Sequence, residues 1–169
     1  MRVDINTIEL VYAIRRESYA ELAVLIQDED LRYKTEPGSE RNEELKKYIK
    51  ESFSELMSAL TRFIQVIPSM QDEDGGVHLD DLSDHLPDVM GIDFKHSERR
   101  LTGKIDLVAR LCNEYLIHSV LFKHYRTVGQ LDLAKSRSEM AAACIERVSA
   151  LLHLKGEPVK TPTNRRPLI

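Results

Sequence analysis

The stretch that decides the fold runs from residue 107 to residue 154 and reads LVARLCNEYLIHSVLFKHYRTVGQLDLAKSRSEMAAACIERVSALLHL. In both halves of this stretch apolar residues recur every three or four positions, which places them on one face of a helix. The tripeptide Thr127-Val128-Gly129 separates the halves and is typical of a turn. The sequence therefore predicts two long helices, about residues 97–125 and 130–154, joined as an antiparallel hairpin.

A further long helix is predicted near the start of the chain. It begins at Asn6, a residue type that caps helices, and Glu9 follows three residues later. The helical pattern fades at residues 28–30, and residues 35–39 have the composition of a turn. Its buried stripe is expected to consist of Ile8, Val11, Tyr12, Tyr19, Leu22, Ala23 and Ile26.

The middle of the chain predicts one long and one short helix. The long one begins at Ser39 or Asn42 and ends before Pro68, since the residue ahead of a proline is disfavoured in a helix. The short one covers residues 79–90 and stops at Gly91. Its apolar positions are Leu79, Leu82, Leu86 and Met90.

These patterns predict an all-α fold, an antiparallel bundle of four long helices with one short extra helix and an extended C-terminal arm. No alternation typical of strands and no internal repeat is evident in the sequence. Residues 1–154 are expected to form the bundle domain, and residues 155–169 the basic, proline-containing arm.

Composition is that of an ordinary globular protein, with 169 residues of which 42% are hydrophobic and 31% charged. No apolar run approaches the roughly 18 residues that a membrane span needs. The N-terminus has no apolar signal-peptide region, so we expect synthesis in the cytoplasm without export. Cys112 and Cys144 are expected to be small core residues in a reducing compartment.

Charge is distributed unevenly along the chain. The arm holds four basic residues and one acid, so it carries +3 and the rest of the chain −7. Between Ser69 and Phe94 there is no Lys or Arg. The arm is predicted to bind a partner through Lys160, Arg165, Arg166, Leu168 and Ile169. The complementary acidic surface is predicted at Asp72, Glu73, Asp74, Asp80 and Asp81, in the same chain or in another copy.

The acidic segment contains two residue patterns that could bind a metal ion. Its acids can be aligned with an EF-hand loop, but Met70 would then occupy the first ligand position and Asp81 the position of the bidentate Glu. His78, Asp81 and His85 are close enough in sequence for a zinc or manganese site, yet they fit a solvated helix surface better. No Glu-x-x-His pair supports a di-iron centre. We therefore predict no metal, no cofactor and no catalytic residue.

One spacing does resemble an enzyme motif. Arg147 and His153 are separated by five residues, as in the motif of helical HEPN-type ribonucleases, although Val148 stands where a polar residue usually follows the Arg. On a continuous helix a six-residue offset rotates about 240°, so the two side chains would diverge. The alternative is an exposed Arg and a His placed favourably at a helix end.

A second resemblance covers roughly residues 101–169. The helix from Leu107 to Tyr125, the tight turn, the helix from Asp132 and the Pro-bearing basic tail together resemble the closing hairpin and arm of small phage head–tail adaptor or tail-completion proteins. The long first helices and the acidic insert depart from that pattern. The resemblance implies a helical subunit that assembles into rings and grips its neighbours with an extended arm.

The sequence therefore predicts a structural subunit of a multi-chain assembly, incorporated into a virion or another large complex. Its partners would be other copies of itself, in a ring-type homo-oligomer, and neighbouring structural proteins. Nucleic acid is not expected as the main ligand, since the body of the chain is acidic. The alternatives are a HEPN-like ribonuclease and a monomeric regulatory helical bundle.

Overall fold

A computed structural model describes residues 1–37, 42–65, 86–95 and 104–153 of the chain. Within these ranges it is mostly helical, as expected, and it also contains two strands. The elements in chain order are β1 (Arg2–Asn6), α1 (Thr7–Leu25), α2 (Glu29–Thr35), α3 (Asn42–Ala59), β2 (Val89–Asp93), α4 (Ile105–Thr127) and α5 (Leu131–His153). The predicted arm, residues 155–169, lies outside the described residues.

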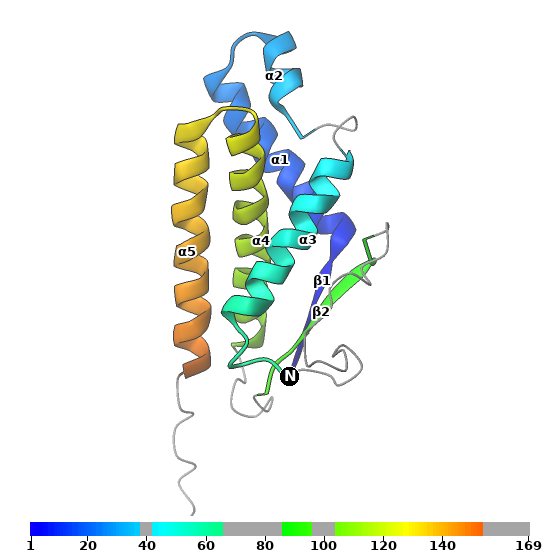
Figure 1. Ribbon diagram of the computed structural model, residues 1–169, viewed down its shortest axis with the longest axis vertical. Coiled ribbons are helices and arrows are strands. Elements are labelled where there is room, and N and C mark those ends of the chain that lie inside the picture. The colour runs from blue at the N-terminus through cyan, green and yellow to red at the C-terminus, as the bar shows by residue number, and fades with distance from the viewer. Residues whose placement is uncertain (38–41, 66–85, 96–103, 154–169) are drawn as a thin grey trace, which may run out of the picture.

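The predicted hairpin of the two last helices is confirmed. Helices α4 and α5 run side by side along most of their length (Figure 1). Gly129 closes the turn between them with a φ of 80°, a left-handed conformation that a residue with a side chain rarely adopts. Helix α4 also packs against α1, α3 and β1, so its apolar residues are buried around most of its circumference.

The two strands form an antiparallel sheet, which the sequence pattern did not predict, in a fold that is otherwise mostly helical. Val3 pairs with Ile92 and Ile5 with Met90, and all four side chains are buried. The alternation in Arg2–Asn6, exposed then buried, is the pattern of a strand with one face on the core. The two strands hydrogen-bond to each other across a separation of some 85 residues, a contact that local periodicity does not reveal.

The same pairing corrects two of the expected helices. Met90 lies in β2 instead of ending a helix, and residues 79–85 of that expected helix are outside the described part. Helix α3 ends at Ala59, well before Pro68, because the chain turns and Ile64 then pairs with Phe94 next to β2. Backbone hydrogen bonds between residues 63–65 and 93–95 therefore take the place of the last helical turns that the sequence predicted for α3.

Helix α2 is a short helix that the sequence did not predict. Asp28 caps it, and its carboxylate accepts hydrogen bonds from the backbone N–H groups of Asp30 and Leu31. The acids that interrupt the apolar pattern at residues 28–30 thus begin a new helix. In Figure 1 α2 lies at the end of the molecule opposite the N-terminus, next to the end of α1.

Candidate interaction surface

Helix α1 has an inner face that packs on the core. Asn6 caps the helix as predicted, and its side-chain oxygen accepts hydrogen bonds from the N–H groups of Ile8 and Glu9 at 3.0 and 3.1 Å. Leu10, Ile14, Ser18 and Leu22 follow at intervals of four residues and are completely buried. This spacing is one side of a helix, and it faces α4.

The stripe that the sequence marked for burial is only partly buried. Leu22 and Ile26 are in the core and Val11 is half-buried, as expected. Ile8, Tyr12, Tyr19 and Ala23 are exposed or nearly so, and the prediction is wrong for these four residues. The stripe through Leu10 and Ile14 faces the core instead. Ser18 is a polar residue within this stripe, and its burial is tolerated because its hydroxyl forms a hydrogen bond with Tyr125.

The exposed residues form a row on another side of α1, about 120° around the helix from the inner face. Ile8 is 72%, Tyr12 68% and Tyr19 54% exposed. At 100° per residue the three lie within about 40° of one another around the helix. Arg15, Arg16 and Ala23 are exposed beside them. We call this set the outer α1 face, and it consists of Ile8, Tyr12, Arg15, Arg16, Tyr19 and Ala23.

Depressions adjoin both ends of the outer α1 face. At the start of the helix, Ile8 and Val11 line a depression of about 280 Å³ together with Lys46 and residues 86–88. Toward the far end, Tyr19 lines another of about 330 Å³ with residues of α2. There the Arg32 guanidinium lies 5.3 Å from the centre of the Tyr19 ring, an attractive cation–π arrangement. The face therefore consists of protruding aromatic and apolar side chains with a depression at each end.

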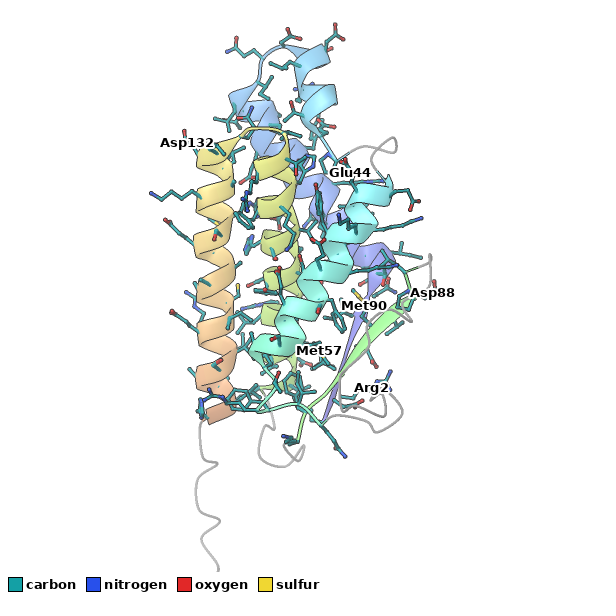
Figure 2. All side chains as sticks on the ribbon, viewed as in Figure 1. Arg2, Glu44, Met57, Asp88, Met90 and Asp132 are labelled. Atoms are coloured by element: carbon teal, nitrogen blue, oxygen red, sulfur yellow. The ribbon has the colours of Figure 1, made fainter. Side chains whose placement is uncertain are left out.

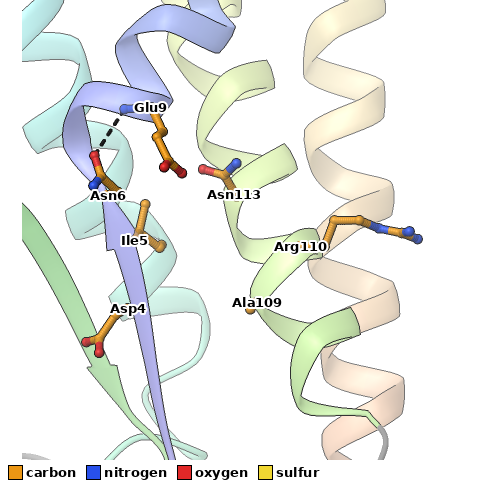
Figure 3. A pocket seen from close by; sticks show the side chains of 7 residues that line it. All are labelled: Asp4, Ile5, Asn6, Glu9, Ala109, Arg110 and Asn113. Carbon is orange, nitrogen blue, oxygen red and sulfur yellow. Dashed lines mark hydrogen bonds between the residues drawn. The ribbon is translucent and has the colours of Figure 1, made fainter.

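A third depression, of about 190 Å³, is polar and lies between the β1–α1 junction and α4. Figure 3 shows Glu9 and Asn113 pointing toward each other across it, while Arg110 extends away. Arg110 pairs with Glu114 at 3.4 Å on its own helix. The lining offers acids and amides but no Ser, Cys, His or Lys side chain.

A buried arginine fixes the orientation of α1. The side chain of Arg137 on α5 is only 6% exposed, and it pairs with Glu17 at 2.6 Å and Glu21 at 2.9 Å on α1. Burial acts to lower the pKa of Arg137, but the hydrogen bonds to Glu21 and Glu17 outweigh it and raise that pKa above its ordinary value. The guanidinium is therefore charged and joins α1 to α5.

Two further side chains from α4 complete this cluster (Arg137, Glu17, Glu21, His118 and Tyr125). The Tyr125 hydroxyl donates to Glu21 at 2.8 Å and lies 3.3 Å from the Ser18 hydroxyl, and burial raises its pKa, so it stays protonated. Burial, and then the charge of Arg137, lower the pKa of His118. Neutral His118 can accept a hydrogen bond at Nδ1 from Arg137, 2.7 Å away.

The two cysteines and the Arg147–His153 pair are the remaining groups that the sequence singled out for their chemistry. Burial raises the pKa of Cys112 to about 12 and also raises that of Cys144, so both thiols are protonated and poor nucleophiles. Arg147 and His153 of the ribonuclease-like spacing are both exposed on α5. The ring of His153 lies edge-on to Phe63 with ring centres 4.8 Å apart, and no hydrogen bond joins it to Arg147.

The predicted partner-binding residues cannot be placed. Lys160, Arg165, Arg166, Leu168 and Ile169 of the arm lie outside the described residues, as do Asp72, Glu73, Asp74, Asp80 and Asp81 of the acidic surface. The metal candidates His78, Asp81 and His85 are outside them too. These assignments therefore stay predictions.

In the part of the chain that the structure describes, no three His, Cys, Asp or Glu side chains come together in a metal-binding group, and no helix there has the length and apolar character to cross a membrane. Comparison with protein-family models, curated proteins and solved structures found no match. The outer α1 face, all of whose apolar residues the sequence assigned to the core, is the feature of the described residues that bears most on function.

Proposed function

We propose that this chain is a structural subunit of a multi-chain assembly, and that the outer α1 face is one of its contact surfaces. The observation that carries the proposal is the row Ile8, Tyr12 and Tyr19, which stands more than half exposed beside two arginines. Single exposed apolar residues are ordinary on protein surfaces. A row of them at helical spacing, rich in Tyr and Arg, has the composition of an interface centre.

The particular assembly we propose is a phage-type head–tail connector, on the resemblance of the C-terminal half. In this proposal the four long helices act as one antiparallel bundle that carries the arm. Arg165 and Arg166 would then pair with the acidic segment of a neighbour, with Leu168 and Ile169 as the apolar anchor. The opposite charges of the two segments support this arrangement.

Solution mass tests the proposal. We would measure it by light scattering for the full chain, for a chain ending at Lys155, and for Tyr12→Ser/Tyr19→Ser. We expect the full chain to have a multiple of the monomer mass and both altered chains to have a lower mass. Val24→Ser/Leu25→Ser is the matched control, since these residues are exposed on the same helix but outside the outer α1 face. A full chain that is monomeric at every concentration would contradict self-assembly and favour the monomeric regulatory bundle.

A further inference from the structure

Helix α5 presents a second exposed helical face. The helix packs chiefly against α4 and forms an edge of the molecule, with Asp132 near the turn (Figure 2). Between Asp132 and Ala150, six of its residues are exposed within an arc of about 80°. We call this set the outer α5 face, and it consists of Asp132, Lys135, Glu139, Ala142, Glu146 and Ala150. Its acids recur every seven residues, so they lie in a line along the helix.

The two outer faces have opposite charge. Three acids and one lysine give the outer α5 face −2, whereas Arg15 and Arg16 give the outer α1 face +2. Among the described residues, neither these arginines nor Glu139 and Glu146 have an ion-pair partner. Each face therefore carries charge that another surface can neutralise.

The outer α1 face is a poor partner for its own copy. Arg15 and Arg16 lie at the middle of the row that runs from Ile8 to Ala23. A two-fold contact between two such rows, parallel or antiparallel, places the arginines of one copy against those of the other. Like charges brought together in this way oppose association, so the favoured partner is an acidic surface.

The outer α5 face also matches the outer α1 face in spacing. Tyr12 and Tyr19 are seven residues apart, roughly 10.5 Å along the helix, with the arginines between them. Ala142 and Ala150 are eight residues apart, roughly 12 Å, with Glu146 between them. Large rings can therefore lie over the small alanines while an arginine meets Glu146, which is ridge-into-groove packing with a central ion pair.

We propose that the outer α1 face of one copy packs against the outer α5 face of the next copy. The proposal rests on the proposed function, because it specifies the partner in an assembly of like subunits. The contact joins two different surfaces, so it is heterologous and each copy keeps one face of each kind for its neighbours. Repetition of such a contact builds a ring when the rotation closes.

Paired charge reversals test this contact in the full-length chain. Variant one is Arg15→Glu/Arg16→Glu, and variant two is Glu139→Lys/Glu146→Lys. Each variant alone opposes like charges at every contact, so self-association should weaken at least about tenfold and the mass should fall to that of a monomer. In an equimolar mixture each contact between the two variants joins unlike charges, and oligomers should form again. All four side chains are exposed, and thermal unfolding by circular dichroism checks that each variant folds.

The control reverses two arginines that are exposed on α4 and α5 outside the two faces, as Arg126→Glu/Arg147→Glu. It makes the same chemical change as variant one and should assemble like the parent. If both reversal variants still assemble, or if both dissociate and the mixture stays monomeric, the α1–α5 contact is overturned while the assembly function stands. Dissociation of variant one alone also overturns it, because another surface then receives α1. A monomeric parent overturns the contact and the proposed function together.

Discussion

The inner and outer faces of α1 each contain residues that depart from the usual relation between polarity and burial. On the inner side Glu17 and Glu21 are mostly covered, in contact with Arg137. On the outer side Ile8, Tyr12 and Tyr19 stand in solvent. The difference teaches that burial in a helix follows from its partners: a carboxylate can be covered when a charged partner meets it, and an apolar row stays exposed when nothing in the described part of the chain covers it.

The largest expected effect comes from truncating a leucine of the inner face. Leu10 is fully buried and Ile8 is 72% exposed on the same helix. Leu10→Ala leaves a cavity and should lower the free energy of unfolding by about 3 kcal/mol. Ile8→Ala, the matched control, should change it by no more than about 0.5 kcal/mol. Urea unfolding followed by circular dichroism measures both, and equal losses would mean that α1 does not turn its Leu10 side to the core.

Removal of the buried arginine should have the next largest effect. Arg137→Met leaves Glu17 and Glu21 covered without their cation, and the free energy of unfolding should fall by about 2 kcal/mol. The effect is moderated because both carboxylates keep some contact with water. Arg147→Met, at an exposed position of the same helix, is the control for loss of a positive charge. An Arg137→Met protein as stable as its control would show that the cluster does not hold α1 in place.

The hydroxyl of Tyr125 should contribute less. Tyr125→Phe keeps the ring in the core but removes the hydrogen bonds to Glu21 and Ser18. We expect a loss of about 1 kcal/mol in the free energy of unfolding. Tyr12→Phe removes a hydroxyl from the exposed face and should leave that free energy unchanged. The two substitutions are chemically identical, so their difference compares the two faces directly.

The smallest expected effect is a dependence on pH. The pKa of His118 is lowered in the folded chain. As the pH falls through the ordinary value of 6.5, His118 therefore binds a proton in the unfolded chain at a higher pH than in the folded chain. Stability from this residue is therefore full above pH 6.5 and is lost as pH falls toward the folded pKa. Urea midpoints at about pH 7.5 and about pH 5.5, on either side of that value, should differ less for His118→Gln than for the parent. An equal fall in both proteins would contradict this role of His118.

Part of the fold could be predicted because its signals are local. The α4–α5 hairpin follows from helical spacing within each segment and from the single glycine that the turn requires. The cap at Asn6 follows from one side chain next to its own backbone. Val3 and Ile5 alternate with polar residues over only five positions, too short a run to indicate a strand, and such a strand has no stability until a second strand pairs with it.

The candidate surface could not be predicted, because α1 carries two rows that both satisfy helical spacing. One passes through Leu10, Ile14 and Leu22, and the other through Ile8, Tyr12 and Tyr19. The second is the more aromatic, so hydrophobicity alone favoured it for the core. The signal against it is the pair Arg15 and Arg16 within the same row, which would be costly to bury unpaired.

The sequence by itself determined where the helical segments lie, how α1 begins and how α4 turns back into α5, since these depend on residues a few positions apart. Only the tertiary structure decided that β1 pairs with β2 and that Leu10 rather than Tyr12 faces the core. Both outcomes depend on partners about 85 to 120 residues away, β2 in one case and Tyr125 and Arg137 in the other. Such contacts form only when the whole chain has folded. The sequence of α1 alone therefore cannot determine which of its faces stays exposed.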